Sequence, residues 1–287
     1  MMIDSHVHVF PDVDERVYDV TELVDRAKAA GFGGLVLKSS QTETAGLASL
    51  YTSEELPLWG GLVLNKPCGG LNPAAVDSMF RTHVGEVRGL GRIVWLPTRH
   101  SDFHIASIAP QEAPGVKLWI DDDPSKPRPE LIEIFDQIAE HDAVLATGHA
   151  NPLHLPAIVK LAKSRGVERI IITHVDQGPS VVSPEAQKEL SDEGCFIEHC
   201  FVGLYLGPNA LSERLRARTP ATMEGIIAGV KATGASHAVF STDAGAIDFP
   251  EPVAAMQKYL SLLGEYGIDD GDIERGSEAN VLSLLTK

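Results

Sequence analysis

Eight short β-rich runs alternate with amphipathic segments along the whole chain, and this alternation constrains the fold more than any other feature. We expect strands at residues 2–8, 34–38, 59–64, 91–96, 143–148, 169–173, 195–199 and 237–242. Strands that alternate with helices pair in parallel, because each helix carries the chain back to the edge at which the previous strand began. No GxGxxG follows the first run, which disfavours an open nucleotide-binding sheet. Eight such units in 287 residues predict an α/β fold, a single (β/α)8 TIM-like barrel over residues 1–287.

Local signals for helix starts and stops support the outer layer of this barrel. A capping side chain directly before proline is typical of a first helical turn. The segment 21–30 ends at Gly31, a natural helix stop, and the run 279–285 is expected to be a closing helix. Residues 129–141 place four apolar side chains on one face, Leu131, Ile134, Phe135 and Ile138. Capped proline starts occur at Asn72-Pro73, Asn151-Pro152, Ser183-Pro184 and Thr219-Pro220.

Residues 98–128 do not fit the repeat and are expected to be a long insertion after strand four. Connections of this length are usually functional or wrongly assigned. The insertion contains the apolar run Val116-Lys117-Leu118-Trp119-Ile120. We interpret it as a lid or hairpin over the strand ends. The alternative is that residues 116–120 form a barrel strand, which would change the strand count by one.

Charge and composition limit the classes of molecule that this protein is expected to bind and the compartment in which it is expected to act. The chain has 24 Lys and Arg against 40 Asp and Glu, a net charge of −16, which disfavours nucleic acid and anionic membranes. The N-terminus lacks a secretory pattern, and no run approaches the roughly 20 apolar residues that cross a bilayer. Three cysteines, Cys68, Cys195 and Cys200, suit a reducing compartment. We expect a soluble, cytoplasmic protein that acts on a small molecule, and a homo-oligomer is compatible with this composition.

Metal-ligand side chains stand where the predicted strands end. His6 and His8 are two residues apart in the first strand and therefore point to the same face. His149, His174 and Asp243 each follow another strand run. Taken singly, each has an ordinary structural interpretation, as a hydrogen-bonded histidine or a helix cap. In a parallel barrel, however, all carboxyl ends meet at one mouth. Imidazoles with a carboxylate are ligands of Zn²⁺, Mn²⁺ and Fe²⁺, so the sequence predicts a divalent metal site, with zinc favoured.

In these residues the chain resembles the amidohydrolase superfamily of metal-dependent hydrolases. The resemblance rests on His6-Val7-His8, His149, His174 and Asp243, and it spans residues 4–245. It implies that the two strand-one histidines and the aspartate hold the catalytic ion. The other two histidines would then hold a second ion or steer the substrate.

One departure from the family pattern leaves the number of ions open, at one or two. Binuclear members carry a carboxylated lysine or a glutamate at the end of strand four, where this chain reads Trp95-Leu96-Pro97-Thr98. Lys38, at the end of strand two, could supply a bridging group or bind an anionic substrate, and a surface role is the alternative. Further candidates for substrate contact are Arg99, His100, His104 and His199, each with a solvated or core hydrogen-bonded role as its alternative.

Together these residues predict a metal-dependent hydrolase acting on an amide, lactone or other ester, or amidine-type bond. A divalent ion lowers the pKa of bound water from about 16 to about 7. Asp243 would take up and return the proton, and His174 would polarise the substrate oxygen. Within the superfamily that the chain resembles, a non-oxidative decarboxylase uses a similar constellation, so decarboxylation is an alternative. A phosphoesterase of the polymerase and histidinol phosphatase type is a second alternative, but it requires a glutamate on a middle strand. A noncatalytic descendant would lack a ligand, and none of the five is missing.

Overall fold

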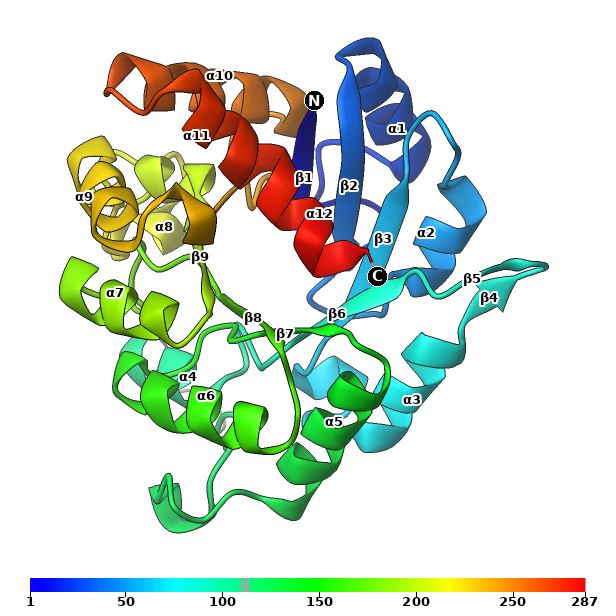
Figure 1. Cartoon of the computed structure of the whole chain (residues 1–287), viewed down its shortest axis with the longest axis vertical. Coiled ribbons are helices and arrows are strands. Elements are labelled where there is room, and N and C mark those ends of the chain that lie inside the picture. The colour runs from blue at the N-terminus through cyan, green and yellow to red at the C-terminus, as the bar shows by residue number, and fades with distance from the viewer. Residues whose placement is uncertain (109, 111–113, 287) are drawn as a thin grey trace.

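The computed structural model describes residues 1–108, 110 and 114–286, and it shows eight parallel strands surrounded by helices (Figure 1). Neighbouring strands follow one another in the order β1-β2-β3-β6-β7-β8-β9-β10. Beyond the strand ends the ring closes, because the backbone N–H of His8 donates to Ala244 (2.8 Å) and that of Asp243 donates to His6 (2.8 Å). The predicted TIM-like barrel is therefore confirmed, with strands β1 (Met2–His8), β2 (Phe32–Lys38), β3 (Leu58–Val63), β6 (Gly91–Trp95), β7 (Val144–Ala146), β8 (Arg169–Ile172), β9 (Phe196–Cys200) and β10 (Ala238–Ser241).

The helices form the outer layer and mostly begin where their capping residues predict. Asn72 and Ser183 each accept a hydrogen bond from the backbone three residues on, and Asn151 caps a short 3-10 turn, η3 (Pro152–His154), that leads into the next helix. The α-helices in this layer are α1 (Val20–Ala29), α2 (Ala45–Tyr51), α3 (Pro73–Arg81), α5 (Pro129–Glu140), α6 (Leu155–Ser164), α7 (Pro184–Asp192), α8 (Glu213–Arg216), α9 (Met223–Thr233), α10 (Pro252–Glu265) and α11 (Asp270–Glu274).

The helix start predicted at Thr219-Pro220 is wrong. Helix α9 begins at Met223, and Thr222 is its cap, accepting from the backbone N–H of Gly225. The backbone before it pairs with other loops: Thr219 accepts from Gly178 (3.1 Å), and Ala221 donates to Gly203 (2.9 Å). These tertiary hydrogen bonds hold residues 219–221 outside the helix.

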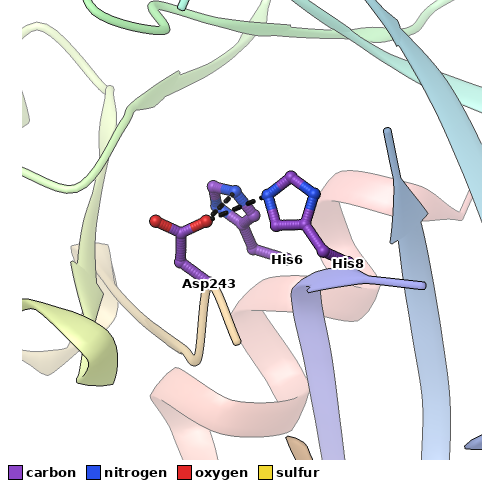
Figure 2. A group of neighbouring side chains, drawn as sticks. All are labelled: His6, His8 and Asp243. Carbon is purple, nitrogen blue, oxygen red and sulfur yellow. Dashed lines mark hydrogen bonds and ion pairs between the residues drawn. The ribbon is translucent and has the colours of Figure 1, made fainter. Parts of the chain in front are cut away.

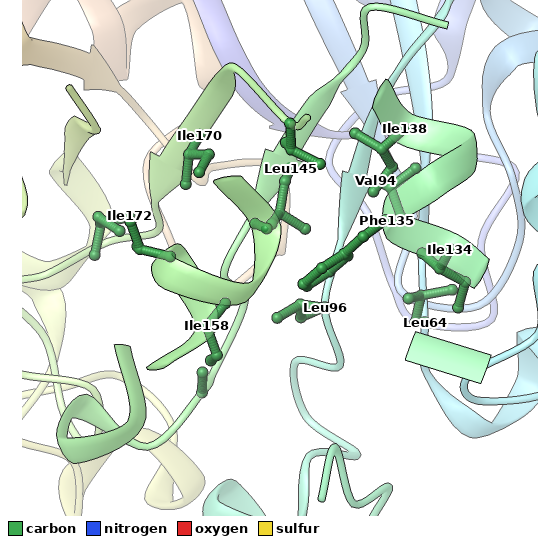
Figure 3. Close-up of a cluster of buried hydrophobic side chains, with 14 of the residues drawn as sticks. Leu64, Val94, Leu96, Ile134, Phe135, Ile138, Leu145, Ile158, Ile170 and Ile172 are labelled. Carbon is green, nitrogen blue, oxygen red and sulfur yellow. The ribbon is translucent and has the colours of Figure 1, made fainter. Parts of the chain in front are cut away.

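Two apolar layers fix the barrel. One lies between the sheet and the outer helices, where Phe135 and its neighbours on α5 pack against strand side chains such as Val94 and Leu145 (Figure 3). The other fills the barrel interior, where Ile3, Trp95 and Val239 pack with Val281 and Leu284 of helix α12 (Asn280–Leu285). A π-helical turn, η6 (Arg275–Ala279), leads into α12, and α12 crosses the end at which β1 begins (Figure 1). That end is thereby plugged.

The segment between β6 and α5 adds no strand to the barrel. It contains α4 (Asp102–Ile108) and a 3-10 turn, η2 (Ile120–Asp122), while residues 109 and 111–113 lie outside the described part. Val116 forms an isolated bridge to Ser101, and Trp119 forms one to Pro127. The alternative in which residues 116–120 form a barrel strand is therefore wrong.

A few short elements complete the chain. A small hairpin precedes β6, formed by β4 (His83–Val84) and β5 (Val87–Arg88). Isolated 3-10 turns are η1 (Lys66–Cys68), η4 (Phe201–Tyr205) and η5 (Ala235–His237). Within the described residues, none of the helices combines the length and the apolar character that a membrane span requires.

Candidate metal centre

Three of the predicted ligands converge at the carboxyl end of the barrel. His6 and His8 project from β1 to the same side, and Asp243 reaches them from the turn after β10 (Figure 2). One carboxylate oxygen, Oδ1 of Asp243, lies 2.9 Å from Nε2 of His6 and 3.2 Å from Nε2 of His8. One donor atom from each of the three residues lies within 4.8 Å of the others. Two nitrogens and one oxygen facing a common point form a donor set that suits a divalent transition metal.

Glu198 on β9 holds His6 from behind, and the sequence interpretation did not identify it. Its Oε1 lies 3.0 Å from Nδ1 of His6 and accepts a hydrogen bond from Ser241 Oγ (2.9 Å), while Oε2 accepts from the backbone N–H of His174 (3.1 Å). Burial alone would raise the pKa of Glu198, but His6 and the other donors outweigh burial and lower the pKa to about 2. The carboxylate therefore fixes Nδ1 of His6 as the protonated nitrogen and leaves Nε2 facing Asp243.

The two strand-one imidazoles differ in charge preference. Burial and the positive charge of Lys38 lower the pKa of His6, but Asp243 and Glu198 outweigh both and raise it to about 9. For His8, burial and the charge of Arg16 lower the pKa to about 3. His8 is thus neutral at physiological pH, as a metal ligand must be.

Lys38 approaches the same point as the three ligands. Its Nζ lies 2.7 Å from Nε2 of His6 and 5.2 Å from the ring centroid of Trp95. The side chain is buried, and burial lowers its pKa. Lys38 is therefore part of the site and not a surface lysine at a strand exit.

The remaining two predicted ligands lie beside this group. The rings of His174 and His6 stack with centroids 6.2 Å apart, and the His149 ring lies 4.6 Å from that of His174. Both ring nitrogens of His174 are buried, and neither has a hydrogen-bond partner among the described residues. Burial lowers the pKa of His174 to about 4 and that of His149 well below its ordinary value. These buried, neutral nitrogens fit a site that receives an ion or a substrate atom.

His149 is also joined to a histidine of the segment after β6. Its Nδ1 lies 2.7 Å from Nδ1 of His104 on α4, so one ring donates and the other accepts. Burial lowers the pKa of His104 to about 3, and the pair is therefore neutral. The sequence interpretation placed His104 at the mouth but carried no signal for this pairing.

A second arrangement of ligand atoms, His6 with Glu198 and Cys200, also lies within 4.8 Å. Burial and the neighbouring carboxylates raise the pKa of the Cys200 thiol well above its ordinary value, and its Sγ contacts Ser241 Oγ (3.2 Å). A thiol that stays protonated is a poor ligand. The group formed by His6, His8 and Asp243 is therefore the better candidate.

The site opens into a cavity of about 540 Å³. The predicted substrate contacts that line this cavity are Lys38, Arg99, His100 and His104. His199 does not, because Glu198 and Cys200 face the barrel interior and the intervening side chain points to the opposite side of the strand. Its Nδ1 instead lies 2.6 Å from Asp176, and its ring packs 6.3 Å from that of Phe240.

Comparisons with known proteins agree with this architecture. The sequence model of a family of unknown function, DUF6282, matches residues 1–198, a stretch that contains the four histidines but not Asp243. Among curated proteins, none matches the chain.

Solved structures match along nearly the whole chain at low identity. The 2,6-dihydroxybenzoate decarboxylase from Rhizobium superposes with a TM-score of 0.60 at 11% identity, covering 99% of this chain and 97% of the other. An organophosphorus hydrolase from Deinococcus radiodurans gives 0.60 at 16% identity, with coverage of 99% and 92%. A mutant PTE-like lactonase from the same organism gives 0.57 at 15%, with coverage of 99% and 95%. These matches show that the chain shares the fold of these enzymes along nearly its whole length.

Proposed function

The chain belongs to DUF6282, a family of unknown function, and we propose that it is a metal-dependent hydrolase. The substrate would be a small molecule with an amide, lactone or other ester, or amidine-type bond. One observation carries the proposal: two imidazoles and a carboxylate converge at the open end of a barrel whose other end is plugged. In barrels of this kind, catalytic residues gather at the carboxyl ends of the strands.

His6, His8 and Asp243 would hold the ion, and His149 with His174 would hold a second ion or orient the substrate. Zn²⁺ is the favoured metal for this donor set, with Mn²⁺ or Fe²⁺ as alternatives. When bound, a divalent ion supplies Lewis acidity and makes water nucleophilic at neutral pH. Lys38 could join the ion as a neutral or carboxylated ligand, since its Nζ lies 2.7 Å from Nε2 of His6.

The chain's own residues supply proton transfer and orientation. Oδ1 of Asp243 faces the two histidines, whereas Oδ2 faces Gln177, whose Nε2 donates to it across 3.3 Å. Oδ2 is therefore the atom at which Asp243 would accept a proton and return it to the leaving group. His174 is neutral, with its pKa near 4, so one ring nitrogen carries a hydrogen that can be donated to the substrate oxygen.

Decarboxylation is the second candidate. Lys38 and Arg99 line the cavity and suit a substrate with a carboxylate, and one of the matching structures is a 2,6-dihydroxybenzoate decarboxylase. Phosphoester hydrolysis by the phosphatase type named above would require a glutamate facing the substrate. Glu198 is instead buried behind His6, with its oxygens committed to protein donors.

Elemental analysis of the purified chain tests the metal site. We expect the wild type to carry a divalent metal, the His6→Ala and Asp243→Ala variants to lose most of it, and a His83→Ala control on the exposed β4–β5 hairpin to keep it. Equal metal content in all four proteins would refute the assigned ligands.

A substrate panel then separates the reactions. Lactones, amides and phosphoesters are assayed for hydrolysis, and hydroxybenzoates are assayed for release of carbon dioxide, each with and without chelator. Turnover confined to phosphoesters would overturn the proposal, and turnover confined to hydroxybenzoates would establish the second candidate.

A further inference from the structure

A guanidinium without a counterion lines the cavity. Arg218 follows α8, and its Nε is buried without a hydrogen-bond partner among the described residues. The other arginines that line this cavity are paired: Arg16 with Asp12 across 2.8 Å, Arg99 with Asp14 across 2.8 Å, and Arg214 through its Nε with Asp248 across 3.1 Å. Within the described part of the chain, no carboxylate is ion-paired with Arg218.

The surroundings of Arg218 disfavour a positive charge that has no paired carboxylate. Burial lowers its pKa, and so do the positive charges of Arg214 and Arg99. Arg218 is partly buried, and a partly buried cation beside other cations is disfavoured unless an anion accompanies it. Acidic side chains outnumber basic ones in this chain by 40 to 24, so the lack of a partner here is not a shortage of carboxylates. The nearby carboxylate of Asp243 is already engaged by His6, His8 and Gln177.

An apolar wall stands next to this cation. Leu206 and Leu215 belong to a small buried cluster against which Phe249 packs, and all three side chains line the cavity. A cavity of about 540 Å³ is of the size that small organic ligands occupy. The mouth therefore offers an anion contact, an apolar surface and the metal-ligand group within one space.

We propose that the substrate is a small organic acid whose carboxylate binds Arg218 and whose apolar body lies against Leu206, Leu215 and Phe249. The reacting group would then be turned toward His8 and Asp243. A planar guanidinium pairs with a planar carboxylate through two parallel hydrogen bonds, which fixes orientation as well as charge. The inference rests on the proposed function for its reaction, but the anion contact is independent of the ion.

Calorimetric titration of the full chain tests the contact with matched ligand pairs. Benzoate and hexanoate are the anions, and benzamide and hexanamide are their neutral counterparts. Each titration is made on zinc-loaded protein and on protein stripped with chelator, so that direct binding of a carboxylate to zinc is recognised. We expect wild type to bind at least one anion about tenfold or more tightly than its amide in both forms, the preference that one charge-assisted contact gives.

Three variants complete the test. Arg218→Gln should lose the preference, Arg218→Lys should recover part of it, and Arg81→Gln, which removes an exposed arginine on α3, should retain it. A preference that survives in Arg218→Gln, or one that exists only with zinc bound, overturns the inference. So does a wild type that prefers neither anion. Metal content separates the two hypotheses, because Arg218→Gln should keep the wild-type content. A wild type that takes up no Zn²⁺, Mn²⁺ or Fe²⁺ refutes the metal site, and the anion contact is then judged from the titrations of the metal-free protein alone.

Discussion

The Glu198→Gln variant tests how Glu198 supports the proposed metal centre, with almost no change in side-chain shape. The carboxylate accepts hydrogen bonds from His6 Nδ1, Ser241 Oγ and the backbone N–H of His174, and the side chain is buried. Glutamine offers a single acceptor oxygen, and its amide nitrogen is itself a donor. In the wild type, His6 and Ser241 donate to Oε1 and the backbone of His174 donates to Oε2. In the variant, at least one of these donors would therefore face the amide nitrogen.

The expected size of the effect follows from these contacts. A buried donor left without an acceptor costs about 1–3 kcal/mol of unfolding free energy. Loss of the carboxylate behind a ligating histidine weakens metal affinity by about 10–100-fold, which corresponds to about 1.4–2.7 kcal/mol of binding free energy. The variant should therefore fold, but with reduced stability, and should bind zinc 10–100-fold more weakly.

Competition with a fluorescent zinc chelator measures the affinity, and urea unfolding of the metal-free protein measures the stability. Glu193→Gln is the matched control, because Glu193 is an exposed glutamate at the end of α7, just before β9 begins. It should change neither quantity. Wild-type zinc affinity in Glu198→Gln would refute the argument that Glu198 orients His6.

Three further predictions concern the fold and its buried polar groups. Phe135→Ala empties a fully buried position and should cost about 3–5 kcal/mol in urea unfolding, whereas Leu153→Ala, at an 86% exposed site, should change stability by less than about 0.5 kcal/mol. Burial raises the pKa of the Cys195 thiol to about 12 from the ordinary 9.0, so between these pH values only the unfolded chain releases the thiol proton. The free energy of unfolding of wild type, measured relative to Cys195→Ala, should therefore fall as pH rises above about 9. Equal dependence on pH in the two proteins would contradict this prediction. His104→Phe leaves Nδ1 of His149 without its partner and should cost about 1–3 kcal/mol by the same unfolding measurement.

The strands and the proposed metal ligands were predictable because local patterns specify them. The apolar runs gave all eight strands to within a few residues, and the alternation of side chains along β1 placed His6 and His8 on one face. The closed barrel explains the position of Asp243, because it brings the ends of β1 and β10 together and thereby places Asp243 beside His6 and His8. No local signal of that kind marks the contact between His104 and His149, which joins two segments only after the chain has folded.

The side chains of β9 show why part of the site escaped sequence analysis. Apart from Glu198 and His199, the run from Cys195 to Cys200 is apolar on both faces, as expected of a strand buried between helices and barrel interior. Alternation therefore does not reveal which of two adjacent polar residues faces inward. The structure points Glu198 to His6 and turns His199 to the helices. A charged residue inside an apolar strand is itself a signal, because a buried carboxylate requires partners.

Backbone strain links this missed carboxylate to the chemistry of the mouth. His174 and Asp243 both adopt positive φ, 33° and 54°, a conformation that costs a non-glycine residue about 1–3 kcal/mol. Each strained residue is held by a hydrogen bond from its own backbone N–H, that of His174 to Glu198 and that of Asp243 to the carbonyl of His6. This backbone conformation directs the side chains of His174 and Asp243 toward the mouth of the barrel, just after β8 and β10 end. Glu198 thus anchors a strained turn and also orients His6, a proposed ligand. Its substitution should disturb His6 and His174 together, whereas loss of Asp243 should remove a proposed ligand without displacing Glu198.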